Sequence, residues 1–353
     1  KGAAIAASVA ELGATCDHVG VCVVNDAGVA EICDELIPAM REGSLLAIHS
    51  TVLPESCEKL EVRCSERGIR FLDAPVSGVQ VIDAHAGTTG RALIELAYTG
   101  ATRQPPRLFV KLPPADEMQR AFVCATGMGR REAMFYRRLS AEIPVRLPRC
   151  HHADADDSGE HYIMLLENLE DSGCIFRAAS SQYSQDLVRS VLAAFARLHA
   201  AYWDSPRFQA ELGWIEPPRQ HPVGVQLVER ALEQHRDTMP PVFSVLAELY
   251  LANADAVHRL WGEGTHTLVH GDVHDGNQFL DGDTPGFLDW AIVSRAPAAR
   301  DVGYYLAAVL KPADCVQFES LLTFYRQSLQ AAGLQPPDPA DLLEQCRWHA
   351  AYV

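Results

Sequence analysis

The fold of this chain is decided by two short runs, LVHGDVHDGNQFL at residues 268–280 and GFLDW at residues 286–290. Both combine apolar residues typical of a short strand with polar residues typical of a loop. Asn277 follows Asp272 by five positions at a strand-to-loop junction, and Asp289 follows Asn277 by twelve positions. The two runs therefore predict two carboxylates and one amide at the ends of two strand-like segments.

Phosphoryl transfer from ATP requires an acceptor hydroxyl held in line and metal ions that neutralise the triphosphate. We interpret Asp272 as the group that orients the hydroxyl, and Asn277 and Asp289 as oxygen ligands of Mg²⁺. The five-position spacing equals that of the protein-kinase catalytic loop, H-R-D-x-x-x-x-N. The segment resembles the motif of the aminoglycoside phosphotransferase and choline kinase family, which are small-molecule kinases with the protein-kinase fold.

The resemblance extends upstream, where further segments follow one another in the order of a kinase small lobe. It implies that Lys111, in the strand FVKL at 109–112, contacts the phosphates and that Glu132 on the next helix pairs with it. It also implies nucleotide contacts for the loop of Gly87, Thr88, Thr89 and Gly90, and for Glu167 and Leu169 in the hinge MLLENL at 164–169.

Each of these residues also has a purely structural interpretation. A single lysine in an edge strand is usually solvated, a Gly-x-x-Gly sequence is usually a turn, and Glu132 fits an exposed helix position. The order and intervals of the segments favour the kinase interpretation. The resemblance further implies that His270 and Asp301 support the catalytic loop, whereas the role of His274 stays open.

Residues 1–78 show a different pattern, because short apolar strands alternate there with amphipathic helices. This alternation predicts βαβ units and a parallel sheet. The runs VCVVND at 21–26, HSTVLP at 49–54 and LDAPVSG at 72–78 resemble 3-hydroxyisobutyrate and related β-hydroxyacid dehydrogenases. Residues 1–78 lack the G-x-G-x-x-G fingerprint of such domains. We therefore expect NAD(P) binding only if a missing N-terminal part is restored.

The predicted fold is thus an α/β remnant, a partial Rossmann-like parallel sheet, followed by an α+β protein-kinase-like bilobal fold. The predicted boundaries are 1–78 for the remnant, 79–166 for the small lobe and 167–353 for the helical lobe. One long helix is expected over residues 116–141. The chain starts at Lys1 and stops within an expected helix, so we interpret it as a piece of a longer reading frame, truncated at the C-terminus.

The charge and composition of the chain limit the kinds of partner that it is expected to bind. The 353 residues carry a formal net charge of −16, which opposes non-specific attraction to nucleic acid or an anionic membrane. No apolar run reaches the length of a membrane span. The ten cysteines include no C-x-x-C pair, which favours reduced core cysteines in a cytoplasmic protein. His151, His152 and the run DADD at 154–157 are interpreted as a solvated hairpin tip rather than a metal cluster.

The sequence therefore predicts an ATP- and Mg²⁺-dependent phosphotransferase that acts on a hydroxyl of a small molecule. Two alternatives stay open: an incomplete NAD(P)-dependent β-hydroxyacid dehydrogenase, and a non-catalytic nucleotide-binding pseudokinase. The sequence does not distinguish ATP from GTP, and it leaves the acceptor and the oligomeric state open.

Overall fold

The computed structural model describes residues 6–23, 25–49, 52–72, 76–98, 104–176, 184–218, 220 and 222–351. The chain divides into two compact units, Lys1–Ala84 with Ala92–Leu108, and His85–Arg91 with Phe109–Val353. The dehydrogenase-like run at 72–78 falls partly on residues 73–75, which lie outside the described residues, and Ser50 and Thr51 of the run at 49–54 lie outside them as well.

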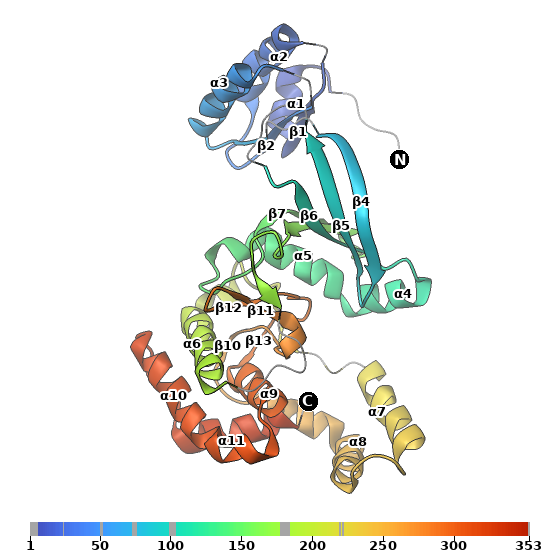
Figure 1. Ribbon diagram of the computed structural model, residues 1–353, viewed down its shortest axis with the longest axis vertical. Coiled ribbons are helices and arrows are strands. Elements are labelled where there is room, and N and C mark those ends of the chain that lie inside the picture. Colours follow the sequence, from blue (N-terminus) through green and yellow to red (C-terminus); the bar gives the residue numbers. More distant parts are fainter. Residues whose placement is uncertain are drawn as a thin grey trace. The chain divides into compact units, whose positions relative to one another are not determined.

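The first unit contains a parallel three-stranded sheet in the order β1-β2-β3, two strands of which, β1 and β2, are labelled in Figure 1. The strands pair with His18 opposite Leu45 and Leu45 opposite Arg70. Their apolar side chains form a core with those of the helices, because strands between helices are buried on both faces. The elements are β1 (His18–Val21), β2 (Leu45–Ile48), β3 (Arg70–Leu72), α1 (Val9–Thr15), α2 (Asp26–Ala39) and α3 (Pro54–Ser65). The predicted partial Rossmann-like sheet is confirmed.

The helices of this unit begin at residues suited to helix starts. Asn25 caps α2, since its side chain accepts the backbone N–H of Gly28 at 2.9 Å. Pro54 occupies the first turn of α3, where its missing N–H costs no hydrogen bond.

A five-stranded sheet contains the strands of the predicted small lobe, in the order β4-β5-β6-β8-β7. Strands β7 and β8 are antiparallel. Along β6, Leu108 and Val110 are buried, and so is Lys111. The strands are β4 (Val76–Ala86), β5 (Gly90–Tyr98), β6 (Arg107–Leu112), β7 (Cys150–Ala155) and β8 (Tyr162–Glu167).

The single helix expected over residues 116–141 is wrong. Two helices occur instead, α4 (Glu117–Thr126) and α5 (Met128–Arg138). Gly127 ends α4 because it adopts a left-handed conformation with φ +68°, which glycine reaches without a steric penalty. The new start lets α5 bury a contiguous set of side chains, Glu132 among them.

The remaining described residues are mostly helical (Figure 1). Their core includes Trp290, stacked on Phe135 with ring centroids 4.3 Å apart, and Phe195, stacked on Phe287 at 5.2 Å. None of the described helices is long and apolar enough to span a membrane. The helices are α6 (Gln185–Tyr202), α7 (Pro222–His235), α8 (Pro241–Trp261), α9 (Ala299–Val309), α10 (Phe318–Ala331) and α11 (Pro339–Ala350). The short strands are β9 (Ile175–Phe176), β10 (His266–Val269), β11 (Gln278–Asp281), β12 (Thr284–Phe287) and β13 (Ser294–Pro297).

Gly303 allows α9 and α11 to approach closely. A Cβ atom on Gly303 would lie 2.6 Å from the carbonyl oxygen of Cys346, a backbone atom that cannot move aside cheaply. We expect Gly303→Ala to lower the free energy of unfolding by about 1–3 kcal/mol, the usual cost of overpacking. Urea denaturation measures this. The matched control is Gly224→Ala in α7, where no atom lies within 4 Å and alanine should be neutral or stabilising. Equal stabilities for the two variants would contradict the close packing of α9 on α11.

Candidate active site

Asp272 and Asn277 are brought together by a short loop. The loop leaves β10 and ends in a 3₁₀ turn at Asp275–Asn277. Asn277 Nδ2 donates to the backbone oxygen of Asp272 at 2.9 Å and to its carboxylate Oδ2 at 3.1 Å. The second carboxylate oxygen, Oδ1, accepts the hydroxyl of Tyr304 at 3.1 Å. Both oxygens of Asp272 are thus oriented by fixed donors.

Tyr304 was missed by the sequence reasoning, although a pattern could have found it. It follows Asp301 by three positions on α9, so both side chains lie on one face of the helix. Because Asp301 was expected to support the catalytic loop, the residue three positions later was a candidate for the same role.

Asp301 holds the start of the loop of Asp272 through two backbone hydrogen bonds. Its Oδ2 accepts the backbone N–H of His270 and its Oδ1 that of Gly271, each at 2.8 Å. His199 Nε2 lies 3.2 Å from Oδ2, and His199 Nδ1 lies 2.8 Å from the hydroxyl of Tyr325. Burial raises the pKa of Asp301, but the hydrogen bond and charge of His199, with smaller contributions from His270 and the N–H of Gly271, outweigh it and lower the pKa overall. The ionised carboxylate therefore fits this buried position.

His270 joins the two runs of the motif. Its Nε2 lies 2.9 Å from the carbonyl oxygen of Leu288, and its Nδ1 accepts the backbone N–H of Asp272 at 3.2 Å. The ring also lies against Trp290, with centroids 4.5 Å apart. His270 thereby fixes the backbone beside both Asp272 and Asp289. His274 is exposed, and its Nε2 lies 3.7 Å from Asp272 Oδ2.

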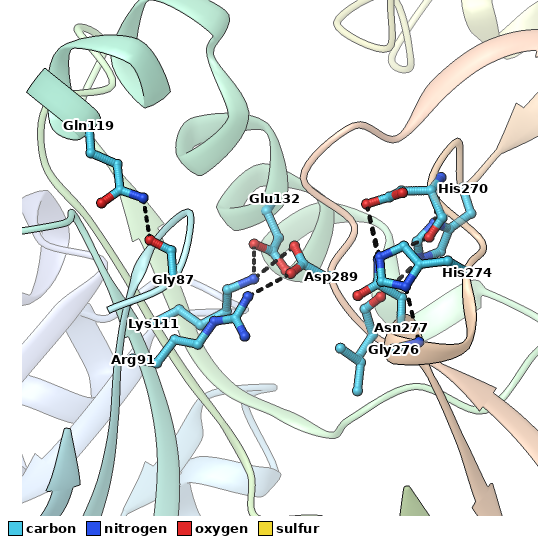
Figure 2. Close-up of polar contacts among 12 residues, drawn as sticks. Gly87, Arg91, Lys111, Gln119, Glu132, His270, His274, Gly276, Asn277 and Asp289 are labelled. Carbon is cyan, nitrogen blue, oxygen red and sulfur yellow. Dashed lines mark hydrogen bonds and ion pairs between the residues drawn. The ribbon is translucent and has the colours of Figure 1, made fainter. Parts of the chain in front are cut away.

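Three charged side chains from distant parts of the sequence lie around Asp289 (Figure 2). Lys111 Nζ lies 2.5 Å from Glu132 Oε2 and 3.1 Å from Asp289 Oδ1. Arg91 Nη2 lies 3.1 Å from Asp289 Oδ2. Burial raises the pKa of Asp289, but Lys111 and then Arg91 outweigh it and hold the pKa below its ordinary value. The structure brings Lys111, Glu132 and Asp289 together, and it adds Arg91, which sequence reasoning did not single out.

Asp289 also has an unusual backbone. Its φ of +64° lies in the left-handed region, which is rare for non-glycine residues and least costly for Asp and Asn. This conformation turns the chain sharply between β12 and Trp290.

The loop over residues 87–90 depends on its glycines. The carbonyl oxygen of Gly87 accepts the side-chain amide of Gln119 on α4 (Figure 2). A Cβ atom on Gly90 would lie 2.9 Å from the backbone oxygen of Pro113, so only glycine fits without a shift. Thr88 is exposed, whereas Thr89 is buried, and its hydroxyl has no hydrogen-bond partner among the described residues.

The predicted hinge is held by an arginine that sequence reasoning missed. Arg146 Nη1 and Nη2 donate to the two carboxylate oxygens of Glu167 at 2.9 and 2.8 Å, and Arg146 Nε donates to Asp281 at 2.7 Å. The backbone N–H of Arg149 adds a bond of 2.8 Å to Glu167. The Glu167 side chain therefore fastens the end of β8, and Leu169 is buried just after it. The Glu167 carboxylate is therefore occupied by partners within the protein.

Glu167 should make stability depend on pH. Burial raises its pKa, but the hydrogen bonds of Arg146, Ser172 and Arg149 outweigh it, and the pKa falls from 4.5 to about 2. A lowered pKa stabilises the folded state above the unfolded pKa, and this stabilisation is lost as the pH falls through the folded pKa. We expect Glu167→Gln to lower the free energy of unfolding by about 2 kcal/mol at pH 7.

Urea unfolding between pH 7 and pH 2.5 checks this expectation. The difference between wild type and Glu167→Gln should be constant above about pH 5 and shrink below pH 4.5. The control is Glu160→Gln on the exposed hairpin tip, which should change stability little at any pH. A difference for Glu167→Gln that did not change with pH would show that the ion pair with Arg146 is not the cause.

The residues around Asp289 have the chemistry needed to bind a divalent cation together with a nucleoside triphosphate. Carboxylate and amide oxygens are the ligands that Mg²⁺ prefers, and Mg²⁺ commonly binds through one or two protein groups plus phosphates. No three His, Cys, Asp or Glu side chains among the described residues form a complete metal cage by themselves, His151 and His152 included. The Thr89 hydroxyl and Arg91 Nε are buried and have no partner in the described part of the chain, as donors for a phosphate would be.

Comparison with known proteins gives two matches along the chain. Residues 78–342 match the phosphotransferase enzyme family, and residues 1–90 match the NAD binding domain of 6-phosphogluconate dehydrogenase. L-threonate dehydrogenase of Cupriavidus necator is 41% identical over 75 residues, 20% of this chain. The chain spans only 25% of the length of that curated relative.

Solved structures of small-molecule kinases resemble most of the chain. An amicoumacin kinase in complex with AMP-PNP and Ca²⁺ is 11% identical, with 77% of each chain covered and a TM-score of 0.51. This likeness shows the kinase-like fold. An aminoglycoside-3'-phosphotransferase of type VIII is 20% identical, with 78% of this chain and 93% of that chain covered and a TM-score of 0.45. Because the family match extends over most of the sequence and includes the loop of Asp272, the chain belongs to the phosphotransferase enzyme family.

Proposed function

We propose that this protein transfers the γ-phosphate of ATP, with Mg²⁺, to a hydroxyl group of a small molecule. One observation carries the proposal: Asn277 is bonded to Asp272, while Asp289 is bonded to Lys111, which is itself paired with Glu132. The first pair supplies an acceptor-orienting carboxylate beside an amide. The second group supplies a carboxylate for metal beside a buried cation for phosphate.

Each side chain has one role in the proposed reaction. Asp272 orients the acceptor hydroxyl and accepts its proton, because its two oxygens are held by Asn277 and Tyr304. Asn277 uses its Nδ2 for Asp272, which leaves its Oδ1 for the cation. When bound, Mg²⁺ neutralises the negative charge of the triphosphate.

Lys111 is positioned to hold the phosphates, and Glu132 is positioned to hold Lys111. Both side chains are almost fully buried, so their ion pair is shielded from water and salt. The backbone around Glu167 and Leu169 contacts the adenine in this proposal, and the loop of Gly87, Thr88, Thr89 and Gly90 covers the phosphates. The lobes meet at residues 166 and 167.

The acceptor is proposed only as a class. The family and its fold support a small molecule with a hydroxyl group, and a screen of amino sugars, amino alcohols and other polyols identifies the compound. The protein belongs to the cytoplasm in this proposal, because its ten cysteines include no C-x-x-C pair and several lie in apolar runs typical of reduced core cysteine.

The test is a thermal-shift titration with ATP, GTP, NADH and NADPH, each with and without Mg²⁺. A ligand that binds the native state raises its apparent stability. We expect ATP to raise the melting temperature only when Mg²⁺ is present. A shift with NAD(P)H and none with any nucleoside triphosphate would overturn the proposed function in favour of a dinucleotide-binding one.

A further inference from the structure

Arg91 forms an ion pair with Asp289, the carboxylate that binds the metal in the proposed function. It follows the loop of residues 87–90 directly, at the start of β5. Its Nη2 lies 3.1 Å from Asp289 Oδ2, while Lys111 lies 3.1 Å from the other oxygen, Oδ1 (Figure 2). Both oxygens of Asp289 are therefore bonded to cations.

The charges around Asp289 balance without a ligand. Glu132 and Asp289 supply two negative charges, and Lys111 and Arg91 supply two positive ones. A divalent cation on Asp289 competes with the lysine and arginine that already bond its two oxygens, because positive charges that share one carboxylate repel one another. If Lys111 loses Asp289, it keeps its ion pair with Glu132. Among the described residues, the ion pair of Arg91 is with Asp289.

The position of Arg91 suits a second phosphate ligand. Its Nε is buried with no hydrogen-bond partner in the described part of the chain. The absence of a side chain at Gly87 lets the guanidinium lie against the loop, because a Cβ there would approach Arg91 Cζ to 3.2 Å. A guanidinium presents its donors in a planar fork that matches phosphate oxygens.

We propose that Arg91 is a second phosphate-binding cation that exchanges partners when nucleotide binds. Without ligand, Arg91 holds Asp289. With Mg²⁺ and nucleotide, Asp289 binds the metal, and Arg91 donates to the phosphate chain next to the loop of residues 87–90. This inference rests on the proposed function and adds a residue to it.

The experiment compares the binding of three ligands that differ in phosphate number. Adenosine, ADP and the non-hydrolysable ATP analogue AMP-PNP are titrated by calorimetry at fixed Mg²⁺ into wild type and Arg91→Gln. We expect Arg91→Gln to weaken AMP-PNP binding by about 10- to 100-fold, the loss of a charged hydrogen bond. Adenosine affinity should not change. Arg130→Gln is the matched control, because this half-exposed arginine on α5 lies 3.9 Å from Asp157 at the hairpin tip, and it should bind all three ligands like wild type.

Other outcomes overturn the proposal in distinct ways. Tighter AMP-PNP binding by Arg91→Gln would show that Arg91 only competes with the metal for Asp289. Equal losses for adenosine and AMP-PNP would show that Arg91 only orders the loop. A wild type that binds adenosine as tightly as AMP-PNP would overturn the proposed function itself, whereas a wild type that prefers AMP-PNP beside an unchanged Arg91→Gln would overturn the role of Arg91 alone.

Discussion

Replacement of Asp272 by asparagine is expected to lower kcat for phosphate transfer by about 10²- to 10⁴-fold, the usual contribution of a positioned general base. Asparagine keeps the size of the side chain, but it removes the negative charge that draws the acceptor proton. It also turns an amide NH₂ toward Asn277 or Tyr304, which both donate to Asp272 in the wild type. Mg²⁺-dependent nucleotide binding should stay within a few-fold of wild type, because Asp272 does not hold the metal in this proposal.

The measurement is single-turnover transfer of the γ-phosphate to the acceptor found in the screen, beside a thermal shift with AMP-PNP and Mg²⁺. Asp283→Asn supplies the control, because it makes the same chemical change on an exposed turn between β11 and β12. Transfer by Asp272→Asn at the rate of Asp283→Asn would assign the acceptor-orienting role to another residue. Loss of transfer together with loss of nucleotide binding would indicate a general collapse of the loop.

Sequence reasoning succeeded where partners are close along the chain. Asp272 and Asn277 are five positions apart, so a single tight turn must keep their side chains near each other. The parallel sheet of the first unit was equally accessible, because each strand is a short apolar run bounded by polar residues, and each run is buried between helices.

Pairs of residues that are far apart in the sequence could not be predicted from a local sequence pattern alone. Lys111 and Asp289 are 178 positions apart, and the sequence analysis paired Lys111 only with Glu132. Arg91 and Arg146 belong to no local pattern, because their partners lie on other strands or loops and depend on how the sheet and loop pack. A surface arginine and a site arginine look the same in the sequence.

The break between α4 and α5 was missed for a different reason. Apolar positions continue on both sides of Gly127, and a glycine within a helix costs only about 1 kcal/mol, so the pattern does not show whether the helix ends there. The structure shows that it does end, with Gly127 in the left-handed conformation. The new helix start lets Glu132 reach Lys111 inside the protein.

Asp289→Asn is expected to abolish the effect of Mg²⁺ on nucleotide binding. Asn tolerates the left-handed backbone at this position, with φ +64°, so the change acts on charge rather than on chain geometry. In the presence of Mg²⁺, AMP-PNP binding should weaken by about 100-fold, since loss of a buried, paired charge costs about 3 kcal/mol or more. Without Mg²⁺, binding should equal or exceed that of wild type, because a carboxylate no longer repels the phosphates.

Weaker binding with Mg²⁺ beside equal or tighter binding without it distinguishes a metal ligand from a residue with a structural role. If Asp289 only held Lys111 and Arg91 in place, its replacement would release both cations from their bonds of 3.1 Å and weaken nucleotide binding with and without Mg²⁺ alike. Calorimetric titrations of AMP-PNP with Mg²⁺ and with EDTA distinguish the two cases, and Asp283→Asn again controls for the loss of one negative charge. Mg²⁺ dependence equal to that of wild type in Asp289→Asn would place the metal elsewhere. Replacement of a metal ligand must weaken the titration with Mg²⁺ and leave the titration with EDTA equal or tighter, because the same carboxylate that attracts Mg²⁺ repels a triphosphate that arrives without it.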